Sequence, residues 1–447
     1  MNKKTKYIGI VLVIIIAIIV IVIIQKNTPI KPLTTYSYGN YNQYSNDGDN
    51  NNVTTEIKNN FISKVIKAKN INGFGFDTTP IISGDSIYIG TMNKSNMTGN
   101  LLSVNRFNFN VNWNDHFSNW VMTNPVVVAS KSMVYIGTGN SIKYKLDSKG
   151  NVLYRGLGSN YIYGISIDTG KIMWKYKTPG EDMPTPVYSN NTLYFANGNK
   201  EFYALNAQTG KLEWKINIGS IVSMSSLLLI GNNIYFGGAS PYTFFDVNIN
   251  THKIQWSDVF PKITGGLDDT TPTYSNGYVY TNATRLTGQT LKNQGYEYLY
   301  KINASTGKII WTINEGKGTI NLPTDPMEGS VSTIVNNILY TSSNTSRRIF
   351  AVNVDTQKNL WSFGINSMIN APFIIKNNLI YAITTSGNIY LLNPLNGEFI
   401  AKRSLGGPEI ASGLTLYNNH IYVATGNGNL YNLSNSNTSN KVTSSTK

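Results

Sequence analysis

The sequence predicts an all-β protein, an eight-bladed β-propeller preceded by one N-terminal transmembrane helix. A phrase made of a turn, an alternating apolar run and an Ile/Val/Leu-Tyr pair recurs eight times, as in Thr79 to Tyr88. Its copies follow one another at about 40 to 60 residues, the spacing typical of propeller blades built from several short strands. An uncharged apolar segment, Tyr7–Ile24, stands before the first copy.

The N-terminus predicts a membrane anchor. Residues 1–6 are basic, and residues 7–24 are long enough to cross a bilayer. No small-residue cleavage site follows, which favours an uncleaved signal anchor over a cleaved signal peptide. The lysines at the amino end predict that this end stays in the cytoplasm. The propeller is then expected on the extracytoplasmic side, anchored to the membrane, or secreted if the segment is cleaved.

The remaining boundaries follow from composition. Residues 25–55 are rich in Tyr, Asn, Ser and Gly and predict a tether that includes a first strand. Residues 56–433 form the predicted propeller, and the polar residues 434–447 predict a disordered tail. Two segments are candidates for the strand that closes the ring, Tyr36–Ser45 and Ile421–Leu433, and the sequence does not decide between them.

Each blade is predicted from two phrases. The first is anchored at Pro80, Pro125, Pro186, Leu227, Pro272, Val331, Pro372 and Gly413. The second is a strand, a turn and a strand ending in Trp, as in Ala204–Trp214 and Lys301–Trp311. Its Asn/Asp-x-x-Thr-Gly-Lys segment is typical of a hairpin turn. Because the tryptophans recur at equal places, we interpret them as packing residues between blades and not as one ligand site.

The composition narrows the function. There is no cysteine, so disulfides and thiolate chemistry are excluded. Charged residues make up 13% of the chain, about half the usual share, which favours an acidic medium. The net charge of +14 suits nucleic acid, an anionic surface or a small anion. Lysines are scattered over turns and no basic-aromatic motif occurs, so we predict a small anionic substrate and no nucleic acid. A homo-oligomer stays open.

Acidic residues gather where a propeller funnel is expected. Functional residues in propellers lie at one end of the channel, where the innermost strand of each blade begins. We therefore examined the positions three and four residues before each anchor. Six of these sixteen places are acidic, namely Asp77, Asp182, Asp268, Asp269, Glu328 and Glu409.

The densest of these stretches is Thr264–Pro272, which holds Asp268 and Asp269. Adjacent carboxylates cannot easily ionise together, so one pKa rises while the other stays low, as general acid and base catalysis requires. Gly265 and Gly266 allow the backbone to approach a ligand. An Asx turn before Thr-Thr-Pro explains the same residues, and both interpretations stay open. For Asp77 and Asp182 the turn is favoured, with substrate binding as the alternative, and Glu328 is a further candidate.

Three other segments supply candidate substrate-binding residues. His116, Trp120 and Asn124 lie in one polar stretch before the second anchor. The insertions Gly139–Tyr163, with Arg155, and Thr284–Tyr298, with Arg285, are long enough to fold over the funnel. Arginine binds sulfonate or sulfate oxygens in a bidentate way. We find no metal-ligand spacing, Ser/His/Asp set, P-loop or dinucleotide motif.

The phrases of the type Ala-x-Asn-x-x-Thr-Gly-Lys-x-x-Trp resemble the tryptophan-docking repeats of the pyrroloquinoline-quinone (PQQ) dehydrogenase-like propellers, over nearly all of residues 75–433. That superfamily includes dehydrogenases, hydrolases and binding scaffolds. Its alcohol dehydrogenases use a Cys-Cys disulfide and a calcium ion held by Glu, Asn and Asp. This chain has no cysteine. We therefore predict no cofactor, with a PQQ-dependent dehydrogenase that binds PQQ with calcium as the alternative.

Within the superfamily, the charge-poor, cysteine-free and exported chain looks most like the tetrathionate hydrolases of acidophiles. Gly265–Thr270 is similar to the place where that family keeps its catalytic aspartate. The resemblance implies that Asp269, with Asp268 as the alternative, activates water against the sulfur chain, giving thiosulfate, sulfur and sulfate. Arg285, Arg155 or His116 would bind the sulfonates. A non-catalytic scaffold, like the propeller lipoprotein of outer-membrane assembly, is the third function class.

Overall fold

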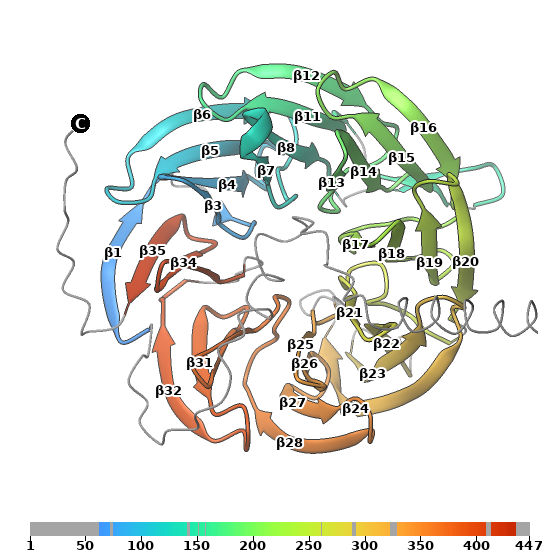
Figure 1. Ribbon diagram of the computed structural model, residues 1–447, viewed down its shortest axis with the longest axis vertical. Coiled ribbons are helices and arrows are strands. Elements are labelled where there is room, and N and C mark those ends of the chain that lie inside the picture. The colour runs from blue at the N-terminus through green and yellow to red at the C-terminus, as the bar shows by residue number, and fades with distance from the viewer. Residues whose placement is uncertain are drawn as a thin grey trace, which may run out of the picture. The chain divides into compact units, whose positions relative to one another are not determined.

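The computed structural model describes residues 62–71, 75–140, 144–150, 152–156, 158–260, 262–287, 292–321, 329–407 and 413–434, all in one compact unit. Within these ranges the strands form eight blades around a central axis, which confirms the eight-bladed propeller (Figure 1). The predicted anchor, the tether, Glu328 and Glu409 lie outside the described residues. Within the same ranges no helix has both the length and the apolar character needed to cross a membrane.

The blades are numbered in chain order, and each is a sheet of antiparallel strands. Blade 1 contains β2 (Gly75–Phe76), β3 (Ile81–Ser83), β4 (Ser86–Met92), β5 (Gly99–Asn105) and β6 (Val111–Phe117). Blade 2 contains β7 (Val126–Val128), β8 (Met133–Thr138), β11 (Tyr161–Ser166) and β12 (Ile172–Lys177), with the 3-10 turn η2 (Ala129–Lys131) and an inserted hairpin of β9 (Tyr144–Leu146) and β10 (Val152–Arg155). Blade 3 contains β13 (Val187–Ser189), β14 (Thr192–Ala196), β15 (Glu201–Asn206) and β16 (Leu212–Asn217). Blade 4 contains β17 (Leu228–Ile230), β18 (Asn233–Gly238), β19 (Thr243–Asn248) and β20 (Lys253–Val259).

The second half of the ring repeats this plan. Blade 5 contains β21 (Thr273–Ser275), β22 (Tyr278–Leu286), β23 (Lys292–Asn303) and β24 (Ile309–Asn321). Blade 6 contains β25 (Thr333–Val335), β26 (Ile338–Ser343), β27 (Arg348–Asn353) and β28 (Lys358–Gly364). Blade 7 contains β29 (Ile374–Lys376), β30 (Leu379–Ile383), β31 (Asn388–Leu392) and β32 (Phe399–Ser404). Blade 8 contains β33 (Thr415–Tyr417), β34 (His420–Ala424), β35 (Asn429–Ser434) and β1 (Lys64–Asn70).

The ring is closed by β1, the first described strand. It pairs antiparallel with β35, with Val65 opposite Leu433, and becomes the outermost strand of blade 8. The segment Ile421–Leu433 supplies β34 and most of β35, the two middle strands of that blade. Strands from both ends of the described chain therefore share one sheet, so the ring cannot open without breaking that sheet (Figure 1).

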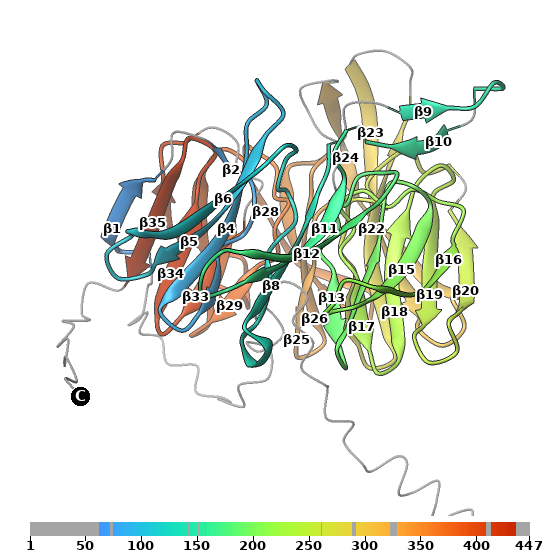
Figure 2. The ribbon, with the colours of Figure 1, turned by 90° about the horizontal axis from the view of Figure 1, so that it is seen from above.

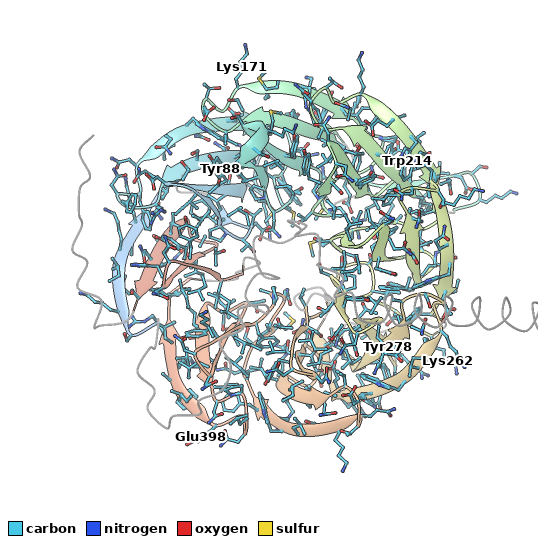
Figure 3. All side chains as sticks on the ribbon, in the orientation of Figure 1. Tyr88, Lys171, Trp214, Lys262, Tyr278 and Glu398 are labelled. Atoms are coloured by element: carbon cyan, nitrogen blue, oxygen red, sulfur yellow. The ribbon has the colours of Figure 1, made fainter. Side chains whose placement is uncertain are left out.

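Burial follows the position of a strand in its blade. The middle strands are covered on both faces by neighbouring blades, and every residue of β14 is buried. The outer strands alternate between partly buried and exposed residues, as in β16. Figure 3 shows Tyr88 between the sheets and Lys171 and Glu398, both exposed, at the rim. Near-continuous apolar runs in the sequence thus indicate the middle strands of a blade, and alternating runs indicate the outer strands.

Tryptophans join neighbouring blades, as the repeats predict. The indole Nε1 of Trp113, Trp174, Trp256 and Trp361 donates to a backbone carbonyl in the turn of the next blade at 2.9 Å. The glycine of that turn lies against the indole ring, and a Cβ atom on Gly210 would come within 2.5 Å of Trp174. Each ring also lies about 6 Å from the tyrosine of its own blade, 5.9 Å for Tyr135 and Trp174. The tryptophans are packing residues.

We expect Gly210→Ala to destabilise the protein by roughly 3 kcal/mol, because it adds overpacking against Trp174 to the cost of a left-handed backbone. The matched control is Gly219→Ala. Gly219 has φ of 75°, close to the 69° of Gly210, but a Cβ atom there has nothing within 4 Å. This control should lower the free energy of unfolding by about 1 kcal/mol. Denaturant unfolding of both variants measures the difference, and equal losses would refute the role of the glycine–tryptophan contact.

Candidate functional site

The candidate site begins at the inserted hairpin of blade 2, which stands out from the ring on the same side as the ends of β23 and β24 (Figure 2). Its last residue, Arg155, is tied to blade 3 through the backbone. Arg155 N donates to Gly198 O at 2.9 Å, and Glu181 N donates to Arg155 O at 2.9 Å. Glu181 precedes β13 in the loop that enters blade 3. The hairpin therefore places a guanidinium group over a neighbouring blade.

Arg155 and Glu181 form a buried ion pair. Nε of Arg155 donates to Oε1 of Glu181 at 2.6 Å, and Nη2 lies 2.6 Å from the same oxygen. The side chain of Glu181 is fully buried, whereas 11% of the Arg155 side chain is exposed. The ring of Tyr144, on the facing strand of the hairpin, lies 5.9 Å from the guanidinium carbon. Breaking such a pair would leave a buried charge without a partner, so the two residues constrain each other.

Asp268 and Asp269 lie in a tight turn between blades 4 and 5. Asp269 N and Thr270 N both donate to Gly266 O, and Gly266 has a φ of 84°, which favours glycine. The carbonyl oxygen of Asp268 accepts hydrogen bonds from Met224 N at 2.9 Å and Ser225 N at 2.7 Å. The loop that enters blade 4 therefore fixes the position of the two carboxyl groups.

The two carboxyl groups have different surroundings. Asp268 is buried, whereas Asp269 is partly exposed. The carboxylate of Asp269 is hydrogen bonded to the Ser223 side chain and to the backbone N–H of Met224, both in the preceding loop. These two bonds tie the Asp269 side chain to the loop that enters blade 4.

The guanidinium group of Arg155 interacts electrostatically with three carboxyl groups, those of Glu181, Asp269 and Asp268. Burial raises the pKa of Asp268 well above its ordinary value, and the neighbouring charge of Asp269 raises it further. Burial also raises the pKa of Asp269, but Arg155 and the bond from Ser223 oppose this rise. Asp269 therefore loses its proton before Asp268, which gives one carboxylate suited to be a base beside one neutral acid.

The structure brings Arg155, Asp268 and Asp269 together, but Asp182 has a structural role. Both carboxylate oxygens of Asp182 have donors, Thr178 Oγ1 at 2.5 Å and Asn197 Nδ2 at 2.9 Å. Burial raises its pKa to about 8. Asp77 is partly buried directly after β2.

Four other candidates lie elsewhere. His116 is exposed on β6, the outermost strand of blade 1, with Nδ1 3.2 Å from Asn100 Oδ1. Trp120 is buried and donates to Asn93 O, while Asn124 accepts from Thr79 N at 2.8 Å. Arg285 is partly buried on β22, where its positive charge opposes the rise in the pKa of Tyr300 that burial causes. The polar stretch that holds these candidates begins on an outer strand, and the polar groups of Trp120 and Asn124 are hydrogen bonded within the fold.

Sequence reasoning missed Glu181 and Tyr242. Glu181 precedes Asp182, and this second pair of adjacent acids could have pointed to it. Tyr242 donates from Oη to Thr264 O at 2.7 Å, and its pKa is raised by burial and by the charges of Asp268 and Asp269. No sequence pattern distinguishes Tyr242 from the many other tyrosines. Among the described residues no group of three or more His, Cys, Asp or Glu side chains is placed to bind a metal ion.

Comparison with known proteins places the chain in a family. The profile of outer membrane protein assembly factor BamB matches residues 158–293 and 246–447, more than half of the chain. Tetrathionate hydrolase of Acidithiobacillus ferrooxidans is 30% identical over 303 residues, which are 65% of this chain and 59% of that protein. The chain thus matches less than two thirds of the length of this curated relative.

Solved structures share the fold at low sequence identity. BamB from Moraxella catarrhalis superposes with a TM-score of 0.60 at 14% identity, covering 83% of this chain and 99% of that one. Quinohemoprotein alcohol dehydrogenase from Comamonas testosteroni gives a TM-score of 0.56 at 12% identity, covering 83% and 76%. The chain therefore belongs to the PQQ-type propeller family described by outer membrane protein assembly factor BamB, and within it has a tetrathionate hydrolase as a relative.

Proposed function

We propose that this protein hydrolyses tetrathionate to thiosulfate, sulfur and sulfate, with Asp269 as the base that activates water. The observation that carries the proposal is the cluster itself. A partly exposed aspartate, Asp269, and its buried neighbour Asp268 both interact electrostatically with Arg155. The tetrathionate hydrolase relative supports this substrate class.

The first step is attack by water on a divalent sulfur of tetrathionate. Asp269 takes one water proton while the oxygen forms a bond to this sulfur. The central S–S bond breaks, and its electron pair leaves with thiosulfate. The other product is HO–S–SO₃⁻, so atoms and charge balance when the proton on Asp269 is counted. Arg155 would bind a sulfonate group and stabilise the charge that develops on the leaving thiosulfate.

The second step needs no further reactant. In HO–S–SO₃⁻ the S–S bond breaks with its electron pair left on the divalent sulfur. The hydroxide leaves that sulfur with the S–O electron pair and bonds to the sulfonate sulfur, which gives elemental sulfur and HSO₄⁻. No net oxidant is consumed. The reaction therefore suits a site in which no step passes through a redox cofactor.

We place this reaction on the extracytoplasmic side of a membrane, with residues 7–24 as the anchor. The proposal rests on the apolar N-terminal segment and its basic flank. A small dianion then meets the protein in the surrounding medium and needs no transport into the cell.

The test is incubation of the purified full-length protein with tetrathionate between pH 3 and pH 7, followed by thiosulfate determination. We expect catalytic release of thiosulfate without added quinone or calcium. Turnover only after reconstitution with PQQ and calcium would favour the dehydrogenase. If the folded protein releases no thiosulfate and oxidises no alcohol under either condition, the hydrolase is refuted and the scaffold remains.

A further inference from the structure

We propose that Glu181 is a positioning residue that occupies Arg155 in the empty site and gives it up to a disulfonate dianion when Glu181 takes up a proton. Anion binding would then be coupled to proton uptake at one ion pair. The ligand class rests on the proposed function, but the coupling itself is a property of the pair.

The first argument is the one-sided geometry of the pair. Both guanidinium contacts go to Oε1 of Glu181. Oε2 of Glu181 is buried and has no hydrogen-bond partner, and Nη2 of Arg155 approaches Oε1 without forming a hydrogen bond of proper angle. A guanidinium and a carboxylate can bind through two parallel hydrogen bonds, and this pair does not. Each group therefore keeps unused bonding capacity while buried, which favours exchange of the partner.

The second argument is the charge around the pair. The charge of Arg155, on β10, lowers the pKa of Glu181, and the charge of Asp269, in the loop before β21, raises it. The charge of Glu181 in turn raises the pKa values of Asp268 and Asp182. Arg155 thus interacts with three carboxyl groups, and Glu181 interacts with a fourth, Asp182. A dianion that enters this site is repelled by each ionised carboxylate, so its binding favours protonation of the group that competes for Arg155. Burial raises the pKa of Glu181 to about 7, although Arg155 opposes the rise.

The third argument is that the exchange needs no backbone movement. Arg155 and Glu181 are held together by the backbone hydrogen bond from Glu181 N to Arg155 O, and Gly198 N donates to Glu181 O at 2.9 Å. Only the side chains have to rearrange. With 11% of its side chain exposed, Arg155 is the member of the pair that reaches solvent.

The test uses dithionate, which has two sulfonate groups but no divalent sulfur to be attacked. Its binding to the full-length protein is measured by titration calorimetry at pH 5 and pH 8.5, in buffers of different ionisation enthalpy. For wild type we expect binding at least about tenfold weaker at pH 8.5, with proton uptake that grows as pH rises. Glu181→Gln keeps the shape without the charge, so it should bind more tightly than wild type at pH 8.5 and lose less affinity between pH 5 and pH 8.5, with Asp268 and Asp269 accounting for the loss that remains.

The matched control is Glu201→Gln, which removes a carboxylate that pairs with Lys215 on the outer part of blade 3 and should leave the pH dependence unchanged. An unchanged pH dependence in folded Glu181→Gln would overturn the proposal. So would dithionate binding to wild type without proton uptake, a result that needs no variant to fold. Dithionate binding with this behaviour but no tetrathionate turnover would refute the proposed function and leave the coupling intact.

Discussion

Asp269→Asn is expected to lower kcat for tetrathionate about a thousandfold while the protein stays folded. The amide cannot accept a proton from water, and a positioned general base contributes a factor of this order. The amide oxygen can still accept a hydrogen bond from Ser223 or Met224 N, so the turn should persist. Steady-state thiosulfate release and circular dichroism measure the two effects. Retention of more than a tenth of the wild-type rate would refute the assignment of the base.

Two further variants make this test specific. Asp168→Asn removes an exposed carboxylate in the β11–β12 turn and should leave kcat unchanged. Asp268→Asn keeps a neutral side chain beside the base, so activity should survive and the acidic limb of the kcat profile should stay close to its wild-type pH. In wild type this limb should lie above the ordinary aspartate pKa, because burial raises the pKa of Asp269. If instead Asp268→Asn abolishes turnover and Asp269→Asn does not, the two roles are exchanged.

The second large effect is on the stability of the folded protein. We expect the free energy of unfolding to fall as pH rises from about 4.5 to 8.5. Its clearest source is a carboxyl pair in blade 5. Glu297 lies on β23 opposite Glu315 on β24, at a bulge in the register of these strands. Glu297 Oε2 accepts from Asn344 N at 2.6 Å, and Glu315 Oε2 accepts from Asn282 Nδ2 at 2.6 Å. Oε1 of each is buried without a hydrogen-bond partner, and the charge of Glu297 raises the pKa of Glu315, so it is costly to ionise both groups.

The sign follows from the direction of the shifts. Burial raises the pKa of Glu297 to about 7 and that of Glu315 well above its ordinary value. Burial also raises the pKa of Glu181 and Asp246 to about 7 and of Asp182 to about 8. A carboxyl group whose pKa is higher in the folded state contributes stability below its unfolded pKa and loses it as pH passes the folded pKa. The loss is therefore expected mainly between pH 4 and pH 8.

Thermal unfolding of the full-length protein at pH 4.5 and pH 8.5 measures this effect. We expect Tm to be at least about 5 °C higher at pH 4.5. Glu297→Gln removes one of two interacting buried charges and should stabilise the protein at pH 8.5 by roughly 2 kcal/mol. Glu398→Gln, on the exposed rim, is the control and should change nothing. A Tm that rises with pH, or a Glu297→Gln variant that is less stable at pH 8.5, would contradict the account.

The repeats made the fold predictable, because the same packing problem recurs in every blade. In four blades the Trp at the end of the second phrase contacts the Gly of the next blade's turn, so the recurring spacing of these two residues indicates blades. The closing strand was not predictable in this way. Residues 64–70 carry neither phrase, since β1 completes a blade whose other strands lie at the far end of the chain.

The site was predictable where it departs from the repeat. Asp268 and Asp269 were found because acids are rare in this chain and these two are adjacent after Gly-Gly. The pairing of Arg155 with Glu181 was not predictable, because an inserted hairpin carries the arginine over the next blade. The pairing of Glu297 with Glu315 was not predictable either, because it depends on a bulge that shifts the register between β23 and β24. The position of His116 on an outer strand was not predictable, because a polar stretch looks the same on an outer strand and in a funnel loop.

The most direct test of the central claim is the product balance of tetrathionate hydrolysis without oxygen or any electron acceptor. Wild-type protein should release one thiosulfate and one sulfate for each tetrathionate consumed, and Asp269→Asn should release neither above the uncatalysed rate. Dependence of turnover on an electron acceptor, or equal thiosulfate release by the folded variant, would contradict hydrolysis at the cluster of Arg155, Asp268 and Asp269.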